Sequence, residues 1–570
     1  MDRRYFFERN LLALSAQNPR LCSRLSAAQT TLNRYKFLQS VSGEIVPALA
    51  DHTGSARPLH SMVDPKKEAH RLMASFIDSS SPSEENFIVF LGLGAGLIQE
   101  AALHSGRVSG VMVIDFDING IAELFCSREY ISLLGDPRFT LLVDPSPECI
   151  ENALFEFYRP AICGGIKVLP LRTRTDADKH NFGLASGTIQ RTIEKVSADY
   201  SVQAHFGTRW FSNIIRNIGA AQDQNRSIPP VREAIICAAG PSLDDQIPYL
   251  LKREKSSKKF FIAADTALPA LLYHGLMPDA VVSIDCQHIS YYHFIGTSCR
   301  DIPLFLDITS PPMLAQFSET PFFFSGGHPL AAYISQEWRP LPQVDTSGGN
   351  VTFACLSLAE NLGAQRISVY GADFSYPLGK MYARGTYIYP YFEHRQERRA
   401  PLEAHLSSFL YRSPFIGSGE CCVGTLNNGT GSSREFHSEA NCYVTEIMHF
   451  YRRCFEEKAS AMEAEVTLAR SRNEPLVFGR NAAGTGKRIT SLFAPGKALM
   501  GAAEFLERYK QAIAALPVQN LTDSEKRVFT TLLPQAAAIK RRCPEMTAPE
   551  LLDAVKSYCI NKIKQLIPEH

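Results

Sequence analysis

The chain has 570 residues, and 45% of them are hydrophobic, which is enough for several hydrophobic cores. A chain of this length is expected to hold roughly three or four domains. Lysine and arginine total 59 against 58 aspartate and glutamate residues, so the formal net charge is only +1. This charge gives no electrostatic reason to expect nucleic acid or a membrane surface as a partner.

Two further observations concern localisation. No uncharged apolar run reaches the roughly 18 residues that a transmembrane helix needs. Residues 1–9 include basic residues but lead into no uninterrupted apolar segment of the kind found in a signal peptide. We therefore expect a cytoplasmic protein without a membrane span.

Residues 1–85 predict an N-terminal α+β segment, and residues 86–200 predict a Rossmann-like accessory domain. The apolar strand that opens this domain leads into the glycine-rich turn 92–96, and a second apolar strand ends at Asp115. Glycines after the first strand and an acid near the end of the second are typical of sites that hold S-adenosylmethionine or a dinucleotide. The pattern is short, so both a methyltransferase domain and an accessory fold without this ligand stay open.

A stripe of apolar residues predicts an amphipathic connecting helix at 201–225, and a central α/β domain follows at 226–445. The first strand of this domain runs directly into the turn Gly240-Pro241-Ser242-Leu243 and a helix. Gly240 allows close approach of a ligand, Pro241 fits a first helical turn, and Ser242 adds a hydroxyl beside free backbone N–H groups. The turn therefore predicts either a phosphate site or a plain strand-to-helix turn.

Acidic residues follow the next two predicted strands. Strand 259–264 ends at Asp265 and Thr266, and strand 279–284 ends at Asp285. Ligands of open α/β sheets lie outside the carboxyl ends of the strands, so these residues are expected to line one crevice with the Gly240 turn. Each aspartate alone also fits a helix cap or a loop.

A second glycine turn, Gly348-Gly349-Asn350, opens an apolar helix and offers N–H groups to an anion or a ribose hydroxyl. The strand after that helix ends at Gly371, with Asp373 two residues further. The following stretch, 382–395, is rich in tyrosine and arginine and predicts either a lid or an ordinary aromatic surface loop. In it, Tyr382 and Arg384 are the candidate substrate contacts, because arginine grips carboxylates and phosphates.

Residues 446–570 contain several amphipathic patterns separated by proline-containing turns, which predict a C-terminal helical domain that docks a protein partner. The predicted fold class is therefore α/β, with two Rossmann-like parallel-sheet domains in tandem and a C-terminal helical bundle.

At these motifs the chain resembles the motility accessory factors, which glycosylate flagellin. The resemblance rests on the Gly-Pro-Ser-Leu turn at 240–243, on the segment 278–285 with its Pro-Asp start and Asp end, and on 362–374, which closes with Gly-Ala-Asp-Phe. Residues 58–69 are similar to a stretch that precedes the same domain in that family, so the match runs over residues 1–445. The shared domain is also similar to the archaeal 6-hydroxymethylpterin pyrophosphokinase.

The first and last of these motifs also look like those of bacterial CMP-sialyltransferases, with two departures. Ala238 and Ala239 stand where those enzymes have a small polar residue between glycines, so the donor contacts of that side chain do not carry over. The catalytic histidine of those enzymes follows the Asp-Phe element by a few tens of residues. By position alone, His394 and His405 are its candidates, and His405 is preferred.

The resemblance implies an inverting, sialyltransferase-like glycosyltransferase that moves a nonulosonic sugar from a CMP-activated donor to Ser or Thr of flagellin. A base accepts the acceptor proton while backbone donors offset the charge on the departing CMP. His405 and Asp373 are the predicted catalytic residues, and Arg384 and Tyr382 the predicted substrate contacts. The predicted nucleotide site comprises Gly240, Pro241, Ser242, Leu243, Asp265, Thr266, Asp285, Gly348, Gly349, Asn350 and Gly371.

The predicted partners are flagellin and the CMP-nonulosonate, with no nucleic acid and no membrane. No cofactor is obligatory; a divalent metal assists some relatives, although no metal-ligand cluster is visible in this sequence. Three alternatives stay open: a pterin pyrophosphokinase-like phosphotransferase, an S-adenosylmethionine-dependent methyltransferase, and a non-catalytic flagellin-binding assembly factor.

Overall fold

The computed structural model describes twelve segments of the chain: residues 3–28, 34–50, 56–78, 86–254, 259–297, 299–377, 379–411, 416–418, 442–470, 474–479, 492–517 and 521–566. The predicted boundary at residue 85 lies outside them. The chain divides into two compact units, each built from two stretches of sequence. Unit 1 comprises Met1–Thr208 with Leu516–Tyr558, and unit 2 comprises Arg209–Ala515 with Cys559–His570.

The N-terminal part of unit 1 contains both helices and an antiparallel sheet. It consists of α1 (Arg3–Gln17), α2 (Pro19–Ser26), an antiparallel sheet of β1 (Tyr35–Gln39), β2 (Ile45–Ala50) and β3 (Ala56–Pro58), and α3 (Pro65–Asp78). Strand β2 is central in this sheet, because Tyr35 of β1 lies opposite its Leu49 and Pro58 of β3 lies opposite its Ala48.

A four-stranded parallel sheet of Rossmann type forms the centre of unit 1, with strand order β6-β5-β4-β7. The strands are β4 (Asn86–Leu91), β5 (Val108–Asp115), β6 (Phe139–Val143) and β7 (Gly165–Pro170). The connecting helices are α4 (Leu97–His104), α5 (Ile118–Phe125), α6 (Ile131–Leu134), α7 (Pro147–Phe157), α8 (Pro160–Cys163) and α9 (Arg172–Ala177). Every residue of β4 is buried, as expected for a parallel strand with both faces covered. Alternate residues of β4 belong to two different core clusters, one on each face of the sheet.

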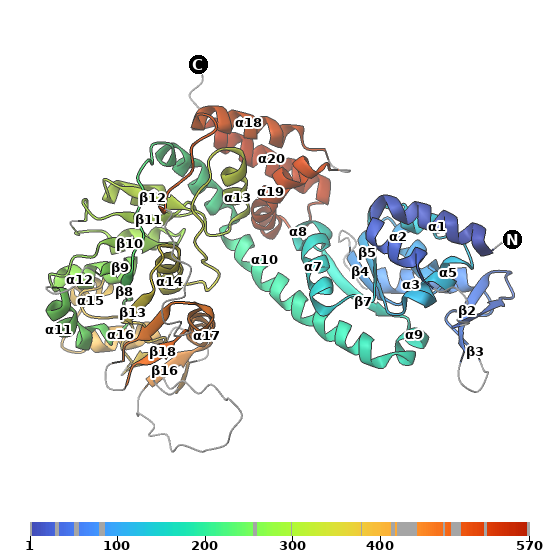
Figure 1. Ribbon diagram of the computed structural model, residues 1–570, viewed down its shortest axis with the longest axis horizontal. Helices are drawn as coiled ribbons and strands as arrows, with labels where there is room; N and C mark the ends of the chain where they lie inside the picture. Colours follow the sequence, from blue (N-terminus) through green and yellow to red (C-terminus); the bar gives the residue numbers. More distant parts are fainter. Residues whose placement is uncertain are drawn as a thin grey trace. The chain divides into compact units, whose positions relative to one another are not determined.

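Three long helices complete unit 1. Helix α10 (Lys179–Gln222) supplies residues to both units, α19 (Asp523–Arg542) belongs to unit 1, and α20 (Ala548–Lys564) belongs to unit 1 as far as Tyr558. Helices α10 and α19 pack so closely at Gly207 that only glycine fits, because a Cβ atom there would lie 1.8 Å from the carbonyl oxygen of Pro534 in α19. The C-terminal helices are thus present as predicted (Figure 1), but α19 and the first part of α20 form part of the unit that holds the N-terminal sheet.

Unit 2 contains an eight-stranded sheet with the order β12-β11-β10-β9-β8-β13-β17-β18. Its strands are β8 (Glu233–Cys237), β9 (Phe260–Ala264), β10 (Ala280–Ser283), β11 (Leu304–Asp307), β12 (Pro321–Phe324), β13 (Arg366–Tyr370), β17 (Glu465–Leu468) and β18 (Leu476–Phe478). All neighbours are parallel except β18, which is antiparallel to β17. The chain grows outward from β8 to β12 and then returns to place β13 on the other side of β8. The topological switch point of the sheet therefore lies between β8 and β13.

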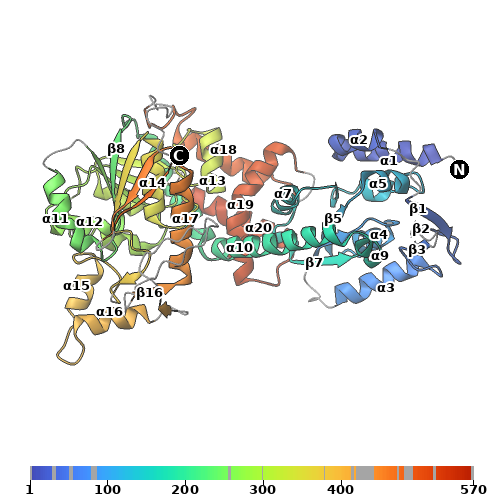
Figure 2. The same ribbon diagram turned by 60° about the horizontal axis from the view of Figure 1, so that its bottom comes forward.

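Helices of unit 2 connect and cover this sheet. They are α11 (Leu243–Glu254), α12 (Leu268–Tyr273), α13 (Pro329–Glu337), α14 (Val351–Asn361), α15 (Ile388–Glu393), α16 (Leu402–Leu410), α17 (Glu446–Ala461) and α18 (Ala502–Ala515). Helix α14 lies against β8, β9 and β10 in the centre of the sheet (Figure 2). A small antiparallel sheet combines β14 (Tyr376–Pro377), β16 (Cys442–Thr445) and β15 (Ile416–Ser418).

The predicted boundary at residue 445 falls inside unit 2. Strand β17 pairs with β13 over Arg366–Val369 and extends the central sheet, and β18 pairs with β17. The sequence pattern after 445 predicts a helical domain, whereas these two short strands are fixed by pairing with a distant part of the chain. The α/β class with two parallel sheets and helices at the C-terminus is confirmed.

Candidate functional site

The loops after β8 and β13 meet at the switch point of the unit 2 sheet. The backbone N–H of Gly240 donates to the carbonyl of Gly371 at 2.7 Å, and the N–H of Ser242 donates to Asp373 Oδ2 at 2.9 Å. A Cβ at Gly240 would lie 2.2 Å from Asp373 Oδ2, and one at Gly371 would lie 2.2 Å from the carbonyl oxygen of Ala238. Both glycines are therefore required by the close approach of the two loops. Pro241 and Leu243 of the same turn are buried.

The side chain of Asp373 occupies the start of α11. Burial raises the pKa of its carboxyl to about 6, although the hydrogen bonds from Ser242 act in the opposite direction. An acid at a helix N-terminus offsets the positive end of the helix dipole. The backbone donor of Ser242, which the sequence predicts for a phosphate, is thus bonded to a carboxylate of the protein itself.

The acids after β9 and β10 lie close to each other at the carboxyl edge of the sheet. Asp265 is buried and accepts hydrogen bonds from the Ser283 hydroxyl at 2.6 Å and from the N–H of Thr266 at 2.7 Å. Asp285 accepts from the N–H of Gln287 at 2.9 Å. Burial raises the pKa of Asp285, and the negative charge of Asp265 raises it further.

Tyrosine side chains lie near these two acids. The ring of Tyr387 lies 6.2 Å from that of Tyr382 and 4.6 Å from the ring of His293, measured between centroids. Burial raises the pKa of Tyr387, followed by the charge of Asp265; burial and then the neighbouring Tyr387 raise that of Tyr382. The hydroxyls therefore stay protonated and available as hydrogen-bond donors at neutral pH.

Tyr451 of α17 completes this group. Burial raises its pKa, with smaller contributions from Tyr376 and Asp285. The second glycine turn lies beside it, because a Cβ at Gly349 would be 3.3 Å from the Tyr451 ring. We refer to Asp265, Asp285, His293, Tyr382, Tyr387 and Tyr451 as the carboxyl-edge cluster.

The polar atoms of the second glycine turn are partly used by the protein. Asn350 caps α14, because its side-chain oxygen accepts from the N–H of Phe353 at 3.0 Å and its amide donates to the carbonyl of Gly348. A Cβ at Gly348 would lie 2.3 Å from the Phe353 ring. The structure therefore places the predicted residues Asp265, Asp285, Gly349 and Tyr382 together.

Three predicted residues lie in other surroundings. The N–H of Arg384 donates to the carboxylate of Asp244 in α11 at 2.9 Å, and its side chain is exposed. His405 of α16 stacks on Phe392, with ring centroids 5.6 Å apart, and its Nε2 lies 3.1 Å from the carbonyl oxygen of Arg395. His394 is exposed at the end of α15. The contacts of His405 with Phe392 and Arg395 join α16 to the segment before it.

Sequence reasoning missed Ser283, His293 and Tyr451. His293 is buried, and its Nδ1 has no hydrogen-bond partner among the described residues. His293 lies at the end of a 3-10 helix, eight positions after Asp285. This short distance in sequence from a predicted site residue is a signal that could have identified His293. Tyr451 had no such signal, because it lies beyond the predicted domain boundary.

The glycine-rich turn of unit 1 is filled by side chains of the same unit. His60 Nε2 accepts from the N–H of Ala95 at 2.9 Å, and a Cβ at Gly94 would lie 2.6 Å from that nitrogen. Asp115, the acid expected to bind a ribose, pairs with Arg174 at 2.9 Å, and both side chains are buried. Burial lowers the pKa of His60 to about 4, so the imidazole is neutral. This packing disfavours a nucleoside ligand at the turn.

Two negative findings concern the described part of the chain. It contains no group of three or more His, Cys, Asp or Glu side chains arranged to hold a metal ion. Within the same residues, no helix is long and apolar enough to cross a lipid bilayer.

Fold and site together define a tandem α/β protein with its acidic and aromatic side chains at the carboxyl edge of the second sheet. Comparison with known families places a 6-hydroxymethylpterin diphosphokinase MptE-like domain at residues 209–379. The fold resembles the structure of the MAf glycosyltransferase from Magnetospirillum magneticum AMB-1, with a TM-score of 0.53 and 14% identity over 99% of this chain and 95% of that one. The predicted resemblance to the motility accessory factors is thereby confirmed at the level of the fold.

Curated relatives occur in Treponema pallidum (strain Nichols), where they are uncharacterized proteins. One is 45% identical over 92 residues, which is 16% of this chain and 32% of the relative, and another is 42% identical over 104 residues, which is 18% and 49%. A third is 29% identical over 201 residues, 34% of each chain. The chain thus matches 32–49% of the length of these relatives. The similarity to CMP-sialyltransferases stays a prediction.

Proposed function

We propose that the protein is a glycosyltransferase that moves a nonulosonic acid from a CMP-activated donor to Ser or Thr hydroxyls of flagellin. The observation that carries this proposal is the carboxyl-edge cluster, which lies where open α/β sheets bind their ligands. The fold shared with a glycosyltransferase supports it. The cytoplasm, where flagellin is synthesised, is the proposed location.

The chemistry of the cluster fits this reaction. Asp265 is buried and bonded to Ser283 and Thr266, so its role is to hold the ends of β9 and β10 together beside Asp285. The neutral hydroxyls of Tyr382 and Tyr387 donate to the phosphate of the donor and stabilise the charge that develops as CMP departs. Asp285 is the proposed base, because its raised pKa favours proton uptake. His405 is not assigned this task, since its Nε2 faces the carbonyl of Arg395.

The proposed step is a direct displacement with inversion. The acceptor hydroxyl oxygen attacks the anomeric carbon of the sugar, and the bond between that carbon and the CMP phosphate oxygen breaks. The hydroxyl proton passes to Asp285, and CMP leaves with the bonding electron pair. A divalent metal that binds the phosphate remains compatible with this step.

The test measures CMP release and the mass gain of flagellin with purified full-length protein. We expect Asp285→Asn to lower kcat by roughly 100-fold or more, the usual contribution of a general base. Asp301→Asn is the matched control, because Asp301 is an exposed acid of the same unit. Full activity of Asp285→Asn would contradict the assignment of the base, and no mass gain with any nonulosonate donor would contradict the transferase itself.

The MptE-like domain supports a second candidate, a pyrophosphokinase. This reaction would consume ATP and hydroxymethylpterin and release AMP, whereas the transferase releases CMP. Incubation with ATP, Mg²⁺ and 6-hydroxymethylpterin therefore separates the two. A protein that binds flagellin but forms neither product would be the assembly factor instead.

A further inference from the structure

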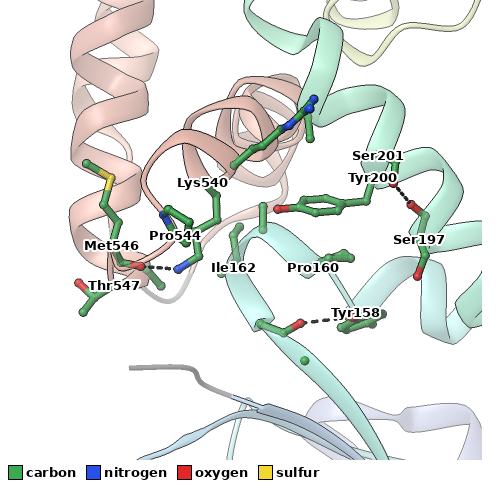
Figure 3. A pocket seen from close by; sticks show the side chains of 16 residues that line it. Tyr158, Pro160, Ile162, Ser197, Tyr200, Ser201, Lys540, Pro544, Met546 and Thr547 are labelled. Carbon is green, nitrogen blue, oxygen red and sulfur yellow. Dashed lines mark hydrogen bonds between the residues drawn. The ribbon is translucent and has the colours of Figure 1, made fainter. Parts of the chain in front are cut away.

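Unit 1 has a pocket at the amino end of β7, opposite to the edge that carries the filled glycine turn. Its volume is about 750 Å³, which lies within the range of small-molecule sites. Segments from α8, α10 and the α19–α20 connection form its walls (Figure 3).

The charged side chains that line this pocket are cations, and a nearby acid, Glu550, lies outside the lining and accepts hydrogen bonds from Thr547. Its described lining contains Lys540 and Arg541 and no aspartate or glutamate. The Lys540 ammonium donates to the carbonyl of Met546 at 2.5 Å, and Arg541 lies 3.2 Å from His205 Nδ1. An ammonium carries three N–H groups and a guanidinium five, so these bonds use a small part of their donor capacity. The net charge of the lining favours an anionic ligand.

Hydroxyl groups form the opposite wall. Ser197, Tyr200 and Ser201 lie on one face of α10, because their spacing of three and four residues matches the helical repeat. Figure 3 shows the Tyr200 ring extending into the pocket, with its hydroxyl on the side of Lys540. Burial raises the pKa of Tyr200, which keeps this hydroxyl protonated. An aromatic face with hydroxyls suits a hydroxylated ring.

We propose that this pocket is a second ligand site that binds a phosphate monoester carried on a hydroxylated ring, such as a sugar phosphate or a nucleotide. Arg541 grips the phosphate through its planar guanidinium, and Tyr200 lies against the ring. The proposal does not depend on the transferase reaction, because every residue that it uses belongs to unit 1.

The test titrates the full-length protein with ribose 5-phosphate, CMP and inorganic phosphate. Calorimetry gives each Kd, and amide hydrogen exchange locates each ligand. We expect ribose 5-phosphate or CMP to protect residues 158–165 and 540–548. Arg541→Gln should weaken this binding about tenfold or more, the usual effect of losing a charged hydrogen bond. Arg542→Gln is the matched control, because this neighbouring exposed cation does not line the pocket.

Tyr200→Phe provides a second, milder variant that keeps the ring and removes the hydroxyl. If CMP slows amide exchange only at 240–243 and 265–285, it binds the proposed donor site of unit 2 and not the pocket of unit 1. The experiment therefore tests the two sites separately. Three results would overturn the proposal: no protection of 158–165 and 540–548 by either organic phosphate, unchanged binding by Arg541→Gln, or equal affinity for inorganic phosphate and ribose 5-phosphate.

Discussion

At the scale of single residues, four aspartates at the carboxyl ends of strands in the unit 2 sheet are in four different environments. Asp265 bonds to the buried hydroxyl of Ser283, Asp285 lies beside the tyrosines, and Asp373 bonds to the start of α11. Asp307 is buried, which raises the pKa of its carboxyl to about 6. The sequence shows one pattern of acids at strand ends, but their chemistry is decided by the elements packed around each.

Asp373→Asn should change how stability depends on pH. The folded-state pKa of Asp373 is about 6 against a usual 3.8, so the folded chain binds its proton more tightly than the unfolded chain does. The wild type therefore loses stability as pH rises from about 4 to 6, and the isosteric amide does not. We expect the free energy of unfolding of the variant to gain roughly 2 kcal/mol on the wild type across this interval, at about 1.4 kcal/mol per pKa unit.

Chemical denaturation of unit 2 at pH 4.5 and 7.5 measures this difference. Asp301→Asn changes an exposed acid of the same unit and should give a curve parallel to the wild type. If Asp373→Asn also ran parallel, the carboxyl would be ionised in the folded protein throughout, and its burial would carry no cost.

Tyr387→Phe tests the proposed phosphate donors. The variant keeps the ring that contacts Tyr382 and His293 and removes only the hydroxyl. We expect kcat for transfer to fall by roughly 100-fold with little change in thermal stability, as for loss of one donor to a developing charge. Tyr391→Phe, at an exposed tyrosine of the same segment, should retain wild-type kcat. Equal rates in the two variants would remove Tyr387 from the reaction.

At the scale of elements, the sequence predicted what local patterns encode. The buried strands before Gly240, Asp265 and Asp285 are present, since continuous apolar runs bounded by turn residues identify parallel strands. The same local patterns could not show whether Gly240 and Gly371 serve ligand binding or packing. Gly240 and Gly371 permit contact between two loops about 130 positions apart in sequence, and no local signal separates such packing from ligand approach.

Gly94→Ala tests whether the glycine turn of unit 1 is filled. Its Cβ would lie 2.6 Å from His60 Nε2 and 2.8 Å from Leu171 Cδ2, and its φ is +56°. Gly106→Ala is the matched control, because Gly106 also has a positive φ (+68°) but nothing within 4 Å of the added atom. Thermal denaturation should show Gly94→Ala less stable than the control by about 1–3 kcal/mol, the usual cost of overpacking.

S-adenosylmethionine provides the complementary measurement on the wild type. A filled turn predicts no increase in Tm on its addition, because only a ligand that binds the folded state stabilises it. Stabilisation by this ligand, together with equal stabilities of the two glycine variants, would restore the methyltransferase interpretation.

At the scale of the whole molecule, neither unit is continuous in sequence. Residues 516–558 belong to unit 1, although more than 300 positions separate them from its other part, Met1–Thr208. Composition and proline- or glycine-containing turns can mark domain boundaries only along the chain. The predicted C-terminal domain 446–570 therefore combines elements of both units. Strands β17 and β18 from this range extend the sheet of unit 2, and helix α17 brings Tyr451 to the carboxyl-edge cluster.

Two truncations should therefore behave differently. A chain that ends at 515 keeps every residue of the carboxyl-edge cluster, whereas one that ends at 445 loses Tyr451 and the strands β17 and β18. We expect CMP to raise the Tm of the first chain and not of the second. The second chain lacks the Tyr451 side chain, and the edge of β13 that pairs with β17 is left unpaired, so the CMP site is lost. The first chain should still show a lower Tm for unit 1, since it lacks α19, whose carbonyl at Pro534 lies against Gly207. Differential scanning calorimetry with and without CMP measures both effects.

CMP stabilisation that survived truncation at 445 would show that α17 is dispensable for the nucleotide and would confine the site to residues before it.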